Sequence, residues 1–132
     1  MFASAAVLEP EAVQSMGQRL NLSPVDLKHL RRYTLGDVKL EKEVLELFLA
    51  QLPQTIAALN GAKSDSEWRI AAHTLKGSGR AVGAWRLARL AEQAERVVVI
   101  KNRPVCGETV KRIEEAADEA KRFIHSTYGA CA

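Results

Sequence analysis

A histidine and a lysine stand beside an unusual group of glycines in the stretch "AHTLKGSGRAVGA" at residues 72–84. The surrounding pattern is helical, yet Gly77, Gly79 and Gly83 follow one another closely. A glycine in a helix interior costs about 1 kcal/mol relative to alanine, so three of them would cost about 3 kcal/mol. Such a cost indicates that this segment needs close approach to another group.

The periodicity of the same stretch predicts which way His73 points. With about 100° between successive residues of a helix, one apolar stripe faces the core. This stripe consists of Trp68, Ala72, Leu75, Gly79 and Val82. His73 lies about 140° from the centre of that stripe, on the same side as Arg69, Lys76 and Arg80. We therefore expect its imidazole to face solvent, with cationic neighbours on the same helix.

This environment favours nucleophilic chemistry. A solvent-facing imidazole is substantially neutral at pH 7, so its Nε2 lone pair is available as a nucleophile. Lys76 shares its face and can meet an incoming phosphoryl group as a point charge. Gly77 removes a side chain one turn beyond the histidine, Ser78 keeps the surroundings small, and Gly83 lets another segment pack closely. These residues together predict access to one ring nitrogen.

Each residue also has a structural alternative. Exposed histidines often have no function, and the neighbouring cations can form an ordinary solvated face. Gly77 and Gly83 can be helix faults or a C-cap. His29 and His125 lie in other predicted helices without such neighbours, and we expect them at the surface or its boundary. No two histidines or cysteines share ligand spacing on one helix, so a metal site is not expected.

The composition predicts a folded, mostly helical single domain over residues 1–132. Of these residues 47% are hydrophobic, 27% charged and 5% aromatic, and the net charge is +3. Dispersed cations without interleaved aromatics argue against a nucleic-acid partner. Cys106 and Cys131 are far apart, which favours free thiols in a reducing compartment. The first residues lack a basic region and no apolar run is long enough to cross a membrane, so we expect a cytoplasmic chain.

The pattern of apolar residues predicts an all-α fold, an antiparallel up-down four-helix bundle at about 23–128 with an N-terminal helical extension at 1–22. The expected helices cover residues 10–20, 23–34, 37–62, 65–82, 84–100 and 108–128.

Helix starts and stops are read from capping residues. Ser23, Asp37, and Asp65 or Ser66 are the expected N-caps. The segment 101–107 is expected to be a loop. In the helix over 37–62, a bend is expected near Pro53, and the residues expected to face the core are those at 40, 44, 45, 47, 48, 49, 52, 56 and 59.

The segment "AHTLKGSGRAVGAWRLARLAEQAE" resembles the signature of histidine phosphotransfer (HPt) domains, which reads H-x-x-K-G with a second glycine ten positions after the histidine. His73, Lys76, Gly77 and Gly83 occupy these positions, and the similarity extends over roughly residues 25–124. The resemblance implies that His73 is the phosphoacceptor and Lys76 a charge stabiliser. It also implies an orienting role for Glu95, which would hold the other ring nitrogen. Gln93 is a nearby candidate that the spacing favours less, and Glu95 can instead pair with a cation on its own helix.

By the same resemblance, the chain is a phosphorelay intermediary without a kinase domain of its own. It would accept a phosphoryl group from the phosphoaspartate of a response-regulator receiver domain and pass it to another receiver aspartate, with a hybrid sensor histidine kinase upstream. Access and docking are expected at Gly77, Ser78, Arg80 and Gly83. No cofactor of its own is expected, and Mg²⁺ would come from the receiver. The main alternative is a helical adaptor that binds a signalling partner without carrying phosphate; a non-specific nucleic-acid binder is a weaker one.

Overall fold

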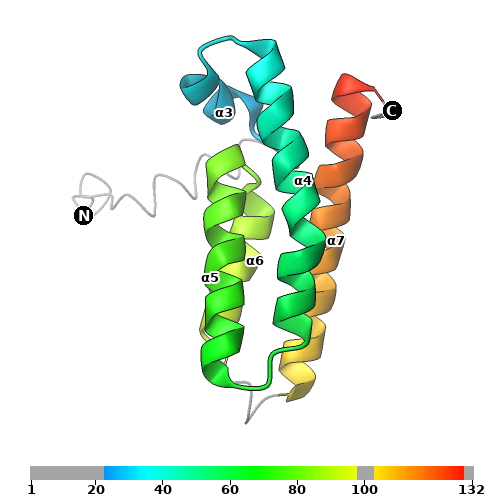
Figure 1. Cartoon of the computed structure of the whole chain (residues 1–132). Helices are drawn as coiled ribbons and strands as arrows, with labels where there is room; N and C mark the ends of the chain where they lie inside the picture. Colours follow the sequence, from blue (N-terminus) through cyan, green and yellow to red (C-terminus); the bar gives the residue numbers. More distant parts are fainter. Residues whose placement is uncertain (1–22, 98–102, 130–132) are drawn as a thin grey trace, which may run out of the picture.

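The computed structural model describes residues 23–97 and 103–129, which contain five helices and no strand. The helices are α3 (Leu27–Thr34), α4 (Val38–Asn60), α5 (Asp65–Val82), α6 (Trp85–Glu95) and α7 (Arg103–Tyr128). Helices α4 to α7 run alternately down and up (Figure 1), and each packs against its two neighbours in a closed ring, with α7 returning to α4. The prediction of an all-α antiparallel bundle is confirmed. The N-terminal extension at 1–22, with its expected helix at 10–20, lies outside the described residues.

The short helix α3 covers one end of the bundle, where it contacts α4 and α5. Its N-cap is Asp26, whose carboxylate accepts a hydrogen bond from the backbone N–H of His29 at 3.1 Å. The expected N-cap at Ser23 is therefore wrong, because residues 23–25 form bends that bury Val25 completely. After α3, Leu35 and Gly36 have positive φ angles of 52° and 84°, and this left-handed pair turns the chain into α4.

Helix α4 begins after Asp37, which caps it as predicted by accepting from the backbone N–H of Leu40 at 3.0 Å. Pro53 lies inside the helix. The helix buries Glu41, Leu45, Phe48, Leu52 and Leu59. The expectation that the residues at 40 and 47 face the core is wrong, since both leucines are exposed and lie outside the stripe that the buried residues define.

Two further helix starts differ from the sequence prediction. Helix α5 is capped by Ser64, whose hydroxyl accepts from the backbone N–H of Glu67 at 3.1 Å, rather than by Asp65 or Ser66. Helix α7 begins at Arg103, so most of the loop expected at 101–107 is helical. Pro104 fits there because backbone N–H groups in the first turn of a helix have no partner within the helix, so a proline costs no hydrogen bond at that position. Helix α6 ends at Glu95, and residues 98–102 lie outside the described part.

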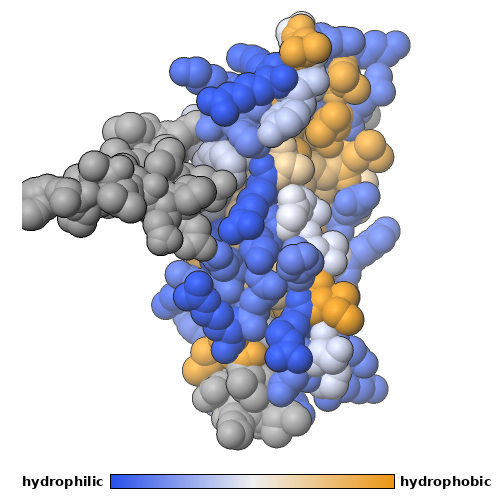
Figure 2. Space-filling model, turned by 90° about the vertical axis from the view of Figure 1, so that its left-hand side faces the viewer, coloured by the Kyte–Doolittle hydropathy of each residue, from blue (hydrophilic) through white to orange (hydrophobic). Residues whose placement is uncertain are grey.

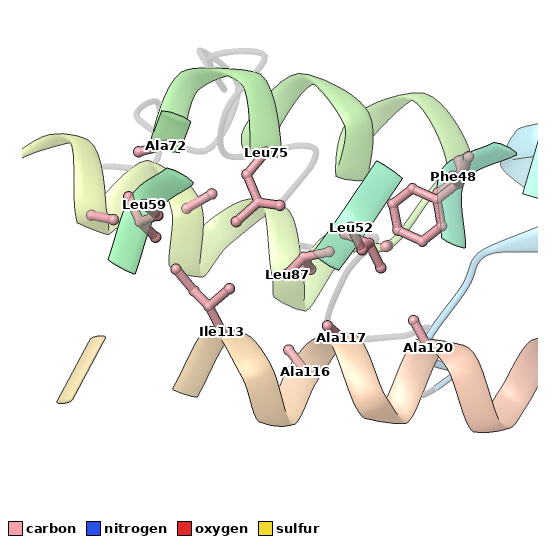
Figure 3. Packing of buried hydrophobic residues seen from close by; sticks show 14 of the residues in the cluster. Phe48, Leu52, Leu59, Ala72, Leu75, Leu87, Ile113, Ala116, Ala117 and Ala120 are labelled. Atoms are coloured by element: carbon pink, nitrogen blue, oxygen red, sulfur yellow. The ribbon is translucent and has the colours of Figure 1, made fainter. Parts of the chain in front are cut away.

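The core uses large side chains from α4 and small ones from α7 (Figure 3). Leu52 and Leu59 of α4 lie near Leu75 of α5 and Leu87 of α6, while α7 supplies Ile113 and a row of alanines below them. These alanines are Ala116, Ala117 and Ala120. Helix α6 also buries alanines, at positions 88, 91 and 94. Small side chains let α6 and α7 approach their neighbours closely, which keeps the four helices in fixed registers.

A buried carboxylate joins three helices at the end of the bundle that α3 covers. The side chain of Glu41 is only 2% exposed, and its oxygens accept from Arg31 Nε at 2.7 Å and Nη2 at 3.2 Å, and from the Tyr128 hydroxyl. The hydrogen bond from Arg31 holds the pKa of Glu41 below its ordinary value although burial acts in the opposite direction. Burial and the bond to Glu41 raise the pKa of Tyr128 to about 12. The cluster therefore fastens α3 and α7 to α4.

Candidate functional site

His73 stands on the outer face of α5. Its side chain is 71% exposed, while the predicted core stripe of the same helix is buried: Trp68, Ala72, Leu75, Gly79 and Val82. The orientation expected from the periodicity is therefore the one in the structure. An imidazole in this position can be reached from solvent by another protein.

The last residue of α6, Glu95, lies beside the ring. Its Oε2 is 3.2 Å from Nδ1 of His73, and its side chain is 22% exposed. The indole N–H of Trp68 donates to the carbonyl of Ala94 at 2.6 Å, which ties the end of α6 to α5 next to this contact. A carboxylate only accepts hydrogen bonds, so it favours the neutral tautomer with the proton on Nδ1 and the lone pair on Nε2. The free nitrogen is thus the one that points away from Glu95.

Lys76 is also bound to Glu95. Its Nζ lies 2.5 Å from Oε1, and its side chain is only 16% exposed. Partial burial raises the pKa of the Glu95 carboxyl, but the hydrogen bonds from Lys76 and His73 outweigh it, and the net result is a lowered pKa. A single carboxylate therefore bridges the lysine and the histidine. Lys76 lies on the same side of α5 as His73, as the sequence predicts, but its amino group is bound to α6, so the alternative of an ordinary solvated face does not describe it.

The sequence of the chain matches the family model of the Hpt domain over residues 43–123. The chain belongs to the Hpt domain family. These domains are helical bundles with a role in phosphotransfer relays, where they interact with receiver domains of two-component systems, and they are phosphocarrier modules without kinase activity. Comparisons with curated proteins and with solved structures gave no significant match. Within the described ranges, none of the helices is both long and apolar enough to cross a membrane.

The glycines near His73 in this Hpt domain have different structural surroundings. A Cβ on Gly77 would meet nothing within 4 Å, whereas one on Gly79 would lie 3.2 Å from the Ala84 carbonyl oxygen and from Cβ and N of Ala88. Gly79 thus lets the start of α6 approach α5. Gly83 is the C-cap of α5 with φ 79°, and a Cβ there would lie 2.8 Å from Asp26.

The surroundings of Gly83 do not match the expectation that this glycine gives a partner access to His73. It is buried, and its carbonyl accepts from the backbone N–H of Asp26 at 2.9 Å, so the space beside it is filled by the segment that leads into α3. Gly83 is therefore the C-cap that the structural alternative described, and it also allows the close packing of another segment that the sequence predicts. Gly77 is exposed and Ser78 half-buried, both within one or two positions of Lys76. Because both residues are small, no large side chain projects from the surface beside His73 at these positions.

Alanine substitutions separate these glycines. We expect Gly79→Ala to destabilise the domain by about 1–3 kcal/mol, because the added methyl group pushes against the α6 backbone. Gly77→Ala is expected to stabilise it by up to about 1 kcal/mol through helix propensity alone. Urea unfolding followed by circular dichroism measures both. Equal effects of the two substitutions would contradict the assignment of close packing to Gly79 and open surface to Gly77.

Arg80 lies on the His73 side of α5 but reaches toward α6. Its Nη2 lies 3.3 Å from Oε2 of Glu92, and its backbone carbonyl accepts from Nε2 of His29 at 3.0 Å. The ring of His29 also contacts Tyr33 and Trp85 edge-on, with centroids 5.5 and 4.7 Å apart. His29 is therefore a packing residue between α3 and α5, a role that the sequence pattern did not indicate. His125 is half-buried on α7, away from this contact.

The described residues contain no group of three or more His, Cys, Asp or Glu placed to hold a metal ion. The chemistry that the arrangement offers is that of a single exposed imidazole. Its Nδ1 is held by the Glu95 carboxylate, which also binds Lys76, and its ring is exposed to solvent.

Proposed function

We propose that this Hpt domain accepts a phosphoryl group on Nε2 of His73 from the phosphoaspartate of a response-regulator receiver domain and returns it to the aspartate of another receiver. The observation that carries the proposal is the exposed ring of His73 with Nδ1 bonded to Glu95 at 3.2 Å. This contact leaves Nε2 as the free nucleophile, and the ring stands where a receiver's active site can reach it.

The reaction balances without a further reactant. The Nε2 lone pair attacks the phosphorus in line, the bond from phosphorus to the aspartate oxygen breaks, and its electron pair returns to the aspartate carboxylate. Nδ1 keeps its proton, so the phosphorylated ring carries a positive charge. The negative charge of Glu95 offsets it, which favours the charged ring over the neutral one. The reverse sequence of steps transfers the group to a second receiver.

A receiver needs a surface to dock on, and apolar side chains are exposed beside the His73 face. Ile70 lies one turn before His73 and is 65% exposed, and Leu47 of α4 is 63% exposed. Figure 2 shows one face of the bundle, which is hydrophilic in its middle and has hydrophobic patches along its right-hand edge and at its lower left. Large apolar residues that are exposed beside a reactive group are typical of a protein contact. We therefore propose that the receiver packs on this edge while its aspartate meets His73.

Ile70→Asp tests the docking surface. The charge is expected to lower the rate of transfer from a phosphorylated receiver by roughly tenfold, because the contact loses apolar burial and gains a desolvated carboxylate. Val105→Asp on α7 is the matched control, since Val105 is also exposed, at 49%, but on another helix. Stopped-flow or quench-flow transfer rates measure the effect. Equal rates for the two variants would exclude this edge as the docking surface.

The wider setting follows from the same proposal. The group would originate from a hybrid sensor histidine kinase, Mg²⁺ would be held by the receiver's acidic pocket, and the exchange would take place in the cytoplasm. The test of the function is to incubate the purified chain with a receiver domain carrying radioactive phosphate. We expect label on the chain that is lost in acid and retained in base, as for a phosphohistidine. A chain that binds the receiver but takes no label would support the alternative of an adaptor without phosphate chemistry.

A further inference from the structure

We propose that an apolar groove beside α3 is the binding site for the chain's own N-terminal segment, and that residues 10–20 pack into it as an amphipathic helix. The groove lies between α3, α4, α5 and the start of α6. This inference goes beyond phosphotransfer, and its test needs neither a receiver nor a phosphoryl group.

The groove has the size and lining of a binding cleft. Its volume is about 570 Å³, within the range of about 300–1,000 Å³ that such clefts have in proteins. Most of its surface is apolar, and its apolar and aromatic lining includes Tyr33, Leu40, Val44, Ala81 and Trp85. A helix with an apolar stripe can bury that stripe in a groove of this kind.

Exposed apolar side chains continue from the groove onto the turn between α3 and α4. Tyr33 is 68% exposed and Leu40 41%, and Leu35 and Val38 between them in sequence are exposed as well. Figure 1 places α3 at the upper end of the bundle, and Figure 2 shows hydrophobic side chains at that same end. A patch of this kind indicates a contact with another segment or protein.

The sequence of residues 10–20, "PEAVQSMGQRL", has the matching pattern. Val13, Met16 and Leu20 share one stripe at helical spacing, while Gln14 and Gln18 lie on the opposite side. An isolated helix shorter than about 12–15 residues is only marginally stable in water. A helix in this segment therefore depends on packing its apolar stripe against a surface.

The chain enters the described fold directly at the groove. The backbone N–H of Asp26 donates to the carbonyl of Gly83 at 2.9 Å, and the indole N–H of Trp85 donates to the Asp26 carboxylate at 3.0 Å. Trp85 is part of the groove lining. Leu20 precedes Asp26 by six positions, and an extended chain of that length spans up to roughly 20 Å. The segment can therefore reach the groove of its own domain.

This short connection favours the segment over other occupants. A binding element joined by a short linker has an effective concentration of about a millimolar at its site. A second copy of the chain at micromolar concentration would have to bind about a thousandfold more tightly to compete. The N-terminal segment therefore occupies the groove even if its contact is weak.

Trypsin measures this docking at a site that the segment itself provides. Arg19 is the first lysine or arginine of the chain, and cleavage after it releases residues 1–19. A protease cuts only the population in which the segment is open, so a docked helix is protected. We expect cleavage after Arg19 in the full chain to be at least about tenfold slower than in a peptide of residues 10–27. Mass spectrometry of the released fragment gives the rate.

Paired substitutions in the full chain locate the contact. Met16→Asp on the stripe and Leu40→Asp in the groove are each expected to speed cleavage after Arg19 by about fivefold or more, because either carboxylate would be buried in an apolar contact. The double variant should be less than about twofold faster than the faster single one, since the contact is already lost.

Matched controls change the charge without touching the contact. Gln14→Asp lies on the polar side of the segment, and Val38→Asp is exposed at 65% on α4 but outside the groove lining. Both should be cleaved at the parent rate. Each substitution within the segment is also made in the peptide, which corrects for the preference of trypsin. Cleavage after Lys28 in α3 reports unfolding, and Tyr33→Asp serves as the groove variant if Leu40→Asp unfolds.

Three results would overturn the proposal. Cleavage of the parent chain as fast as the peptide would show that the segment is not docked. Faster cleavage in Met16→Asp with no change in a folded groove variant would place the segment on another surface. Protection that is lost on dilution of the chain would assign the groove to a second copy. None of these results bears on whether His73 accepts a phosphoryl group.

Discussion

A His73→Gln variant is expected to fold as the parent chain does and to take up no phosphoryl group from a phosphorylated receiver. The imidazole is 71% exposed, so the substitution should change the free energy of unfolding by less than about 0.5 kcal/mol. Glutamine keeps an N–H group that can donate to Glu95. It has no nucleophilic nitrogen, because the amide lone pair is delocalised. The loss of transfer should therefore be complete.

His125→Gln is the matched control, since it makes the same change at a half-buried histidine on α7. That variant is expected to take label at the rate of the parent chain. Circular dichroism and urea unfolding show whether the two variants are equally folded. Normal labelling of His73→Gln, or loss of labelling in His125→Gln alone, would remove His73 from the reaction.

The largest effect on stability is expected at Glu41. Its carboxylate is 2% exposed and accepts from Arg31 and from Tyr128, which come from two other helices. Glu41→Gln places an amide N–H₂ among these donors, so at least one buried hydrogen bond is lost. We expect a loss of about 2–3 kcal/mol in the free energy of unfolding at pH 7. Glu43→Gln, at an exposed position on the same helix, should change it by less than about 0.5 kcal/mol.

Acid provides a second measurement of the Glu41 cluster. The hydrogen bond from Arg31 lowers the pKa of Glu41 in the folded state, so its contribution to stability is complete above the carboxyl's ordinary pKa and is lost as the pH falls through the folded-state value. The difference in stability between the parent chain and Glu41→Gln should therefore shrink as the pH falls below about 4.5. A difference that is the same at pH 7 and in acid would show that the charge of Glu41 contributes nothing.

Much of the bundle follows from local pattern. The stripe on α5 and the apolar positions of α7 repeat at helical spacing, and Asp37 has the capping geometry that its type predicts. The start of α3 was not predictable in this way. Ser23 and Asp26 are both good caps, and the choice depends on burial of Val25 and on the bond between Asp26 and Gly83, which lie far apart in sequence. Local propensity cannot rank caps that tertiary contacts decide.

In the candidate site, too, some features follow from local sequence and others depend on tertiary contacts. Exposure of His73 follows from the helical period, and the contact with Glu95 follows from the family spacing. The position of the Lys76 amino group does not follow from the sequence, because a lysine side chain is long enough to reach either solvent or the next helix. The carboxylate at the end of α6 beside it determines that it binds there. Glu41 was missed for a related reason. One acidic residue within an apolar stripe is the only local sign of a buried carboxylate, and its partners Arg31 and Tyr128 lie on other helices.

The central claim is that Nε2 of His73 is the atom that carries the phosphoryl group while Glu95 holds Nδ1. Phosphorus and ¹⁵N NMR spectra of the chain after transfer from a phosphorylated receiver test it most directly. We predict one phosphohistidine, at His73, with phosphorus bonded to Nε2 and a proton retained on Nδ1. Phosphorus on Nδ1, on another residue, or on no residue of the chain would contradict the account.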